Sequence, residues 1–129
     1  MAKRELPKPT DAELAILRVL WERGPSTVRE VTDAIQEERG TGYTTALKLM
    51  QIMTEKGLVR RDDTNRSHVY EAVAAAEETQ RQLVGDLLDR AFGGSAQQLV
   101  LQALSGRKAS RADLAEIRKL LDEMEQKAK

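Results

Sequence analysis

Apolar residues recur at helical spacing in the first part of the chain, and capping signals mark where two helices begin. The first helix begins at the capping-box pair Thr10 and Glu13 and ends before Gly24. The second begins at a similar pair, Thr27 and Glu30, and glycines end it about ten residues later. The pattern therefore predicts two short helices joined by a tight connection.

A third helix is predicted between Gly42 and Gly57, and its two faces differ in chemistry. At about 100° per residue, one face gathers Ala46, Leu49, Met50 and Met53, whereas the opposite face gathers Thr44, Lys48, Gln51 and Glu55. We expect the apolar face to pack. The hydroxyl, amide and ammonium groups of the other face suit base edges and phosphates, although a merely solvated face would have the same pattern.

Two strand-like runs follow, on either side of a turn at residues 62–65. Val69, Tyr70 and Val73 have the β-branched and aromatic side chains that strands favour, and His68 is expected in the same strand. Three helices followed by a hairpin predict a winged helix-turn-helix.

The second half of the chain has the pattern of three amphipathic helices. Ser95, after two glycines, should cap the second of them, and Ser110 with Asp113 should cap the third. Their apolar faces carry Leu83, Leu87, Leu88, Phe92, Leu99, Leu104, Leu114, Ile117, Leu120, Leu121 and Met124. The winged helix uses its own apolar faces internally, so these residues are predicted to form the interface of a homodimer.

The predicted fold class is mainly α with a small β-hairpin wing, in two domains. Residues 1–75 form a winged helix-turn-helix DNA-binding domain, and residues 76–129 form a helical dimerisation domain. Two recognition helices related by a two-fold axis would bind two half-sites of an operator.

Charge and composition limit the classes of protein to which this chain can belong. The chain of 129 residues has 21 Lys and Arg against 21 Asp and Glu, so affinity for DNA must come from local placement of basic residues. The candidates are Lys48, Lys56, Arg60, Arg61 and Arg66. With no cysteine, no apolar run near twenty residues and no signal-peptide pattern, the sequence predicts a cytoplasmic protein without disulfides, thiolate metal sites or membrane contact.

Catalytic chemistry has little support in this sequence. His68 is the only histidine, and neighbouring acidic residues occur in turns and at helix ends, so we predict no enzyme, no metal site and no cofactor. Two alternatives stay open: a protein-interaction module on a winged-helix scaffold that does not bind specific DNA, and a small hydrolase built around His68 and the acidic turn.

The order of motifs resembles the BlaI/MecI family of penicillinase-type repressors. The similarity rests on AELAILRVLWERG, TVREVTDAI, YTTALKLMQIMTEKGLVRR, RSHVYEA and the GGS between two C-terminal helices, and it extends from about Thr10 to Met124. The resemblance implies a winged-helix homodimer that binds a palindromic operator and represses β-lactamase, resistance or related genes. By position, it places Thr44, Thr45, Lys48 and Gln51 on the recognition helix, and Arg60 and Arg66 on the wing.

The resemblance also suggests a sensor protease as a partner acting on the C-terminal domain. Antibiotic-responsive members are cut at an Asn-Phe bond, whereas the matching residues here are Gln102 and Ala103, so that inducer route is not carried over. The copper-responsive branch has a cysteine-rich metal site, and the absence of cysteine excludes it here.

Overall fold

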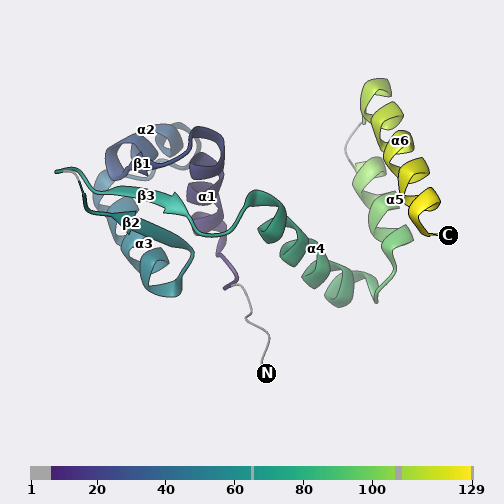
Figure 1. The fold of residues 1–129 in the computed structure, drawn as a ribbon, viewed down its shortest axis with the longest axis horizontal. Coiled ribbons are helices and arrows are strands. Elements are labelled where there is room, and N and C mark those ends of the chain that lie inside the picture. Colours follow the sequence, from purple (N-terminus) through teal and green to yellow (C-terminus); the bar gives the residue numbers. More distant parts are fainter. Residues whose placement is uncertain (1–6, 65, 107–108, 129) are drawn as a thin grey trace. The chain divides into compact units, whose positions relative to one another are not determined.

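The computed structural model describes residues 7–64, 66–106 and 109–128, so Asn65 of the predicted turn lies outside the described residues. The chain divides into two compact units, Met1–Gly85 and Asp86–Lys129, and each is described by itself. In chain order the elements are α1 (Asp11–Arg23), β1 (Ser26–Thr27), α2 (Val28–Arg39), α3 (Tyr43–Lys56), β2 (Val59–Asp62), β3 (Val69–Ala72), α4 (Ala76–Phe92), α5 (Ala96–Gly106) and α6 (Arg111–Ala128) (Figure 1).

Capping boxes begin α1 and α2, as the sequence predicted. The hydroxyl of Thr10 accepts from the amide of Glu13 at 3.2 Å, and the carboxylate of Glu13 accepts from the amide of Thr10 at 2.9 Å. Thr27 and Glu30 form the same reciprocal pair at the start of α2. Each box satisfies backbone N–H groups that have no partner within the helix, which fixes the first turn.

The wing is part of a three-stranded antiparallel sheet in the order β1-β3-β2. The predicted hairpin of β2 and β3 is confirmed, with Arg61 opposite Tyr70. The sequence analysis did not anticipate β1, whose Ser26 also lies opposite Tyr70. A strand of two residues has no periodicity to detect, and it exists only because β3 offers a free edge. The placement of His68 in the strand was wrong, because it lies just before β3, which begins at Val69.

The core of the first unit lies between α1, α2, α3 and the sheet. It consists of Ile16, Leu17, Leu20, Val28, Val31, Ile35, Ala46, Met50, Met53, Leu58, Val59 and Tyr70. The predicted packing face of α3 is confirmed, since Ala46, Met50 and Met53 have no exposed surface. Burial of this face turns the opposite face of α3 outward, because side chains half a helical turn apart point in opposite directions.

Trp21 anchors α1 to the segment that precedes α4, within the first unit. Its side chain is half-buried against the core, and its indole N–H donates to the carbonyl oxygen of Ala74 at 3.0 Å. The predicted domain boundary after residue 75 falls where α4 begins, and that division stays a prediction.

The second unit contains the end of α4 together with α5 and α6. The hydroxyl of Ser95 accepts from the amide of Gln98 at 3.2 Å, and Ser110 and Asp113 form a capping box, so the predicted caps are present. Neither α5 nor α6 contains a buried residue, although both carry many apolar side chains.

Candidate nucleic-acid interface

The outward face of α3 carries the residues that the sequence analysis selected. Thr44, Thr45, Lys48 and Gln51 are all exposed. Within the described residues, none of their side chains forms a hydrogen bond or an ion pair with another residue, so their polar groups are available to a partner. Met50 and Met53, on the other side of the helix, are buried in the core, and their packing fixes the direction of this face.

The start of α3 differs from the starts of α1 and α2. Gly42 is the N-cap of α3 and provides no side-chain acceptor, whereas threonines cap the other two helices. Amide groups of the first turn of α3 therefore keep their donors for an external acceptor, and a phosphate oxygen suits that position.

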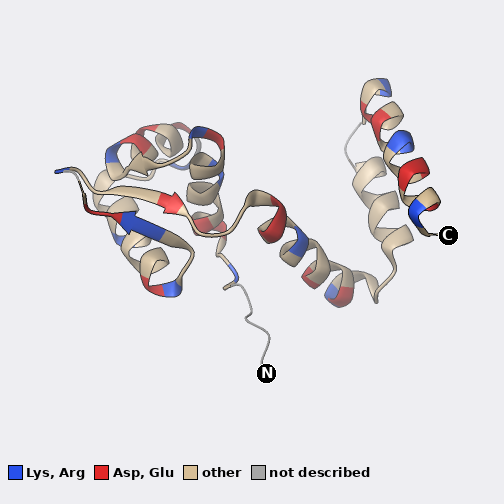
Figure 2. Ribbon diagram, viewed as in Figure 1, with Lys and Arg blue, Asp and Glu red and all other residues tan. Residues whose placement is uncertain are grey.

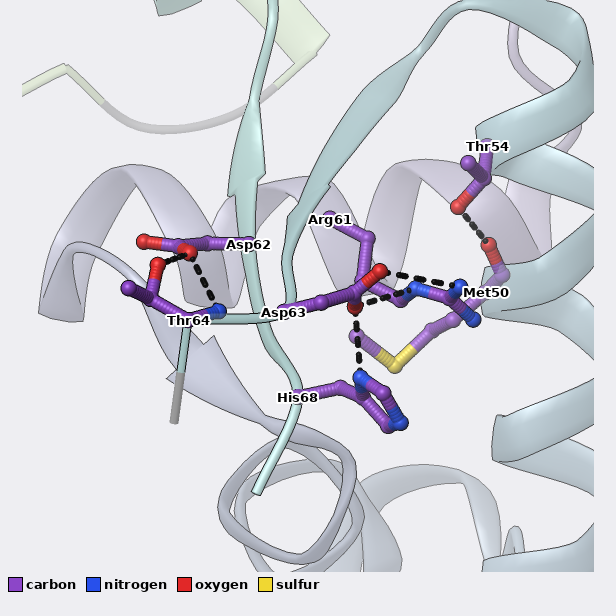
Figure 3. Close-up of polar contacts among 7 residues, drawn as sticks. All are labelled: Met50, Thr54, Arg61, Asp62, Asp63, Thr64 and His68. Atoms are coloured by element: carbon purple, nitrogen blue, oxygen red, sulfur yellow. Dashed lines mark hydrogen bonds and ion pairs between the residues drawn. The ribbon is translucent and has the colours of Figure 1, made fainter. Parts of the chain in front are cut away.

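The charges of the wing are largely paired among themselves. The guanidinium of Arg60 lies 3.0 Å from a carboxylate oxygen of Glu71, its partner across the hairpin. Arg61 lies 2.7 Å from a carboxylate oxygen of Asp63, and that carboxylate also contacts Nδ1 of His68 at 2.5 Å (Figure 3). Arg60 and Arg61 are therefore less available to a phosphate than the sequence suggested.

The contacts of Asp63 with Arg61 and His68 affect the pKa of its carboxyl group. Burial raises the pKa of the Asp63 carboxyl, but the hydrogen bonds from His68 and Arg61 outweigh that effect, so the pKa lies below its ordinary value. The Asp63 carboxylate in turn raises the pKa of Arg61. In the same loop, the amide of Thr64 donates to Asp62 at 2.9 Å, the Thr64 hydroxyl also contacts this carboxylate, and these bonds lower the pKa of Asp62 (Figure 3). The acidic turn therefore stabilises the loop of the wing.

Two of the predicted phosphate-contacting residues, Lys56 and Arg66, differ in whether their charge is already paired. Lys56 was a candidate for phosphate contact, but its ammonium lies 2.7 Å from the carboxylate of Glu13, whose side chain is only 3% exposed. Lys56 therefore stabilises the packing of α3 on α1. Arg66 is exposed and has no ionic partner within the described residues, so it is the wing arginine that is free to bind DNA.

A groove of about 290 Å³ connects the wing with α2 and α3. It is lined by residues 27–29, by Tyr43 and Leu47 of α3, and by residues 66–68 and Tyr70 of the wing. The sequence analysis missed Arg29 and Tyr43, whose side chains meet here. The available signal was an arginine in the first turn of α2, where the helix dipole favours acidic residues.

Other kinds of site find no support within the described ranges. No group of three or more His, Cys, Asp or Glu side chains there could hold a metal ion. No helix in the same part of the chain has the length and apolar character needed to cross a membrane.

Comparisons with known proteins agree with this geometry. Residues 9–123 match the family model described as penicillinase repressor. Two curated relatives, from two strains of Mycobacterium tuberculosis and both called transcriptional regulator BlaI, are 34% identical over 127 residues, which is 97% of this chain and 89% of theirs. Both names describe a transcriptional regulator and not an enzyme, which confirms that prediction.

A solved structure bears on the fold. The solution structure of the DNA-binding domain of the repressor BlaI aligns with a TM-score of 0.51 at 20% identity, and the match covers 59% of this chain and 93% of that one. This likeness confirms the predicted winged-helix fold class.

Proposed function

The chain belongs to the penicillinase repressor family and is a DNA-binding transcriptional repressor, and we propose that it acts as a homodimer on an inverted-repeat operator. The observation that carries the proposal is the free polar face of α3, with Arg66 of the wing lining a groove that also reaches α3. The proposal also implies that the protein works in the cytoplasm, where bacterial operator DNA is found.

In this proposal, α3 lies in the major groove and its exposed side chains contact base edges. Gln51 can bond an adenine through both groups of its amide, and Lys48 can donate to the acceptors of a guanine or to a phosphate. The hydroxyl and methyl groups of Thr44 and Thr45 suit phosphate oxygens and thymine methyls. Arg66 contacts the backbone beside the wing, and Arg60 contributes less because of its pairing with Glu71.

The C-terminal helices supply the argument for a dimer. Leu87, Leu120 and Met124 are 50%, 52% and 64% exposed in the single chain, which is unfavourable for large apolar side chains in water. Figure 2 shows no charged residue on α5, whereas α6 carries both signs. An uncharged helix and an amphipathic helix with no buried residue are what a partner chain would cover.

A dimer also explains how a winged helix-turn-helix domain with little excess positive charge can bind DNA tightly. Among the described residues of α3 and the wing, only Lys48 and Arg66 are cations outside an ion pair, so a single half-site gives weak affinity at physiological salt. Coupling two readers makes the second binding event intramolecular and fixes the spacing of the half-sites.

The test is binding of the full-length protein to a duplex that it selects from a random-sequence pool. We expect the selected sequence to be an inverted repeat bound by two chains, with log affinity falling linearly with log salt concentration. A duplex that keeps one half-site and scrambles the other is the control, and it should bind much more weakly. Selection of no sequence, or equal affinity for the two duplexes, would contradict the proposal.

We also propose that, where a sensor protease controls this repressor, the cut falls within residues 93–104. Gln102 and Ala103 are exposed but lie inside α5, so a protease must dock and open the helix locally before it can cleave. A cut there would separate the dimerising segment from the reader and leave weakly bound monomers. Mass spectrometry of the repressor from cells treated with a cell-wall antibiotic tests this, because an intact chain during confirmed induction would exclude proteolytic release.

A further inference from the structure

The groove between α2, α3 and the wing has a basic lining. Arg29 of α2 lines this groove together with Arg66 and His68 of the wing loop. No carboxylate is among its lining residues, although Asp63 contacts His68 from outside the groove. In a chain with equal numbers of acidic and basic residues, two arginines that line one groove without a carboxylate attract an anion.

Arg29 is held in place by an aromatic ring. Its guanidinium carbon lies 5.0 Å from the centroid of the Tyr43 ring, within the range of a cation-π contact. Stacking on a ring leaves the N–H groups at the edge of the guanidinium free to donate, and Arg29 has no carboxylate partner within the described residues. Tyr43 is itself 43% exposed, so this contact does not serve the core.

The position of Arg29 does not favour helix stability. It occupies the first turn of α2, where the positive end of the helix dipole opposes a cation. Neighbouring Glu30, in the same turn, has the charge that the dipole prefers and completes the capping box with Thr27. An exposed arginine at an unfavourable helix position, oriented by a ring, is better explained by a ligand than by folding.

We infer that Arg29, positioned by Tyr43, contacts the DNA backbone. Together with Arg66 it binds the sugar-phosphate backbone of one DNA strand in this groove, beside the recognition helix. The inference rests on the proposed function and extends it from α3 and the wing to α2. The guanidinium would donate to phosphate oxygens, a charge-assisted contact that is strong but insensitive to sequence.

The test uses the full-length protein, a duplex selected by it and a scrambled duplex of the same length. Arg29→Ala should weaken binding to both duplexes by about tenfold for each half-site, since hydrogen bonds between charged groups have that magnitude. It should also reduce the salt slope by about 0.9 for each chain. Arg29→Lys should restore the slope but not the full affinity. The matched control is Arg18→Ala, which removes an exposed arginine of α1 that does not line the groove, and it should change neither quantity.

Substitutions of Tyr43 test whether its ring positions Arg29. Tyr43→Phe keeps the ring and should bind like the unaltered protein, whereas Tyr43→Leu should weaken binding severalfold but have no further effect when Arg29 is already alanine. If Arg29→Ala leaves affinity and slope unchanged while Lys48→Ala weakens binding, the inferred Arg29 contact is wrong and the proposed function stands. If the unaltered protein binds neither duplex, the proposed function itself fails.

Discussion

Replacing Lys56 by methionine should destabilise the first unit without altering its contact with DNA. In the structure the Lys56 ammonium lies 2.7 Å from the Glu13 carboxylate, with the lysine side chain 33% exposed and the glutamate side chain 3% exposed. Removing one partner of a fully buried ion pair costs about 3–5 kcal/mol, and the partial exposure of Lys56 reduces our expectation to about 2 kcal/mol. For a domain of this size that loss corresponds to a decrease in melting temperature of about 10 °C.

The pKa of Glu13 predicts how the stability loss caused by Lys56→Met changes with pH. Burial raises the pKa of Glu13, but the hydrogen bonds from Lys56 and Thr10 and the charge of Lys56 together lower it below its ordinary value of 4.5. A lowered pKa means that the contribution to stability is present above pH 4.5 and is lost as the pH falls through the lower value of the folded state. The difference in stability between the unaltered protein and Lys56→Met should therefore decrease at acidic pH, because a protonated Glu13 is neutral and no longer forms an ion pair with Lys56.

Thermal and urea unfolding of the full-length chain, followed by circular dichroism, measure the effect. In a Glu13→Gln background the capping hydrogen bond can persist, so Lys56→Met should cost much less there. An equal cost in both backgrounds would refute the ion pair as the cause. Lys48→Met, on the exposed face of the same helix, is the matched control, and it should change the salt slope of DNA binding while Lys56→Met should not.

The remaining predictions concern DNA binding and assembly. Lys48→Ala and Gln51→Ala should weaken operator binding with unchanged melting temperature, by about 1–3 kcal/mol where the lost contact is to a base, as measured by fluorescence anisotropy. Arg66→Ala should weaken binding to all sequences and lower the salt slope by about 0.9 for each chain, whereas Arg60→Ala should have a smaller effect because a neighbouring carboxylate already pairs it; equal effects would contradict that distinction. Leu120→Asp should place a charge on the proposed apolar interface and give a monomer in sedimentation, and a full-length monomer without the substitution would contradict the dimer.

Much of the local structure could be predicted from the sequence, because its causes lie within a few residues. The capping boxes at Thr10 and Thr27 involve partners three residues away, so their pattern is visible in the printed chain. The two faces of α3 follow from helical geometry alone, and the burial of Met50 opposite exposed Lys48 agrees with that geometry. The family resemblance used the same motifs, and the family match confirms it.

Tertiary structure alone decided which polar groups are already paired and which are free. Lys56 meets a carboxylate 43 residues away, which turns a candidate DNA contact into a structural residue. Arg60 and Arg66 look alike in the sequence, but only Arg60 faces Glu71 across the hairpin. Arg29 meets Tyr43 because α2 and α3 pack together. The partner of a charge depends on which segments come together in space, and periodicity along one segment contains no information about its neighbours.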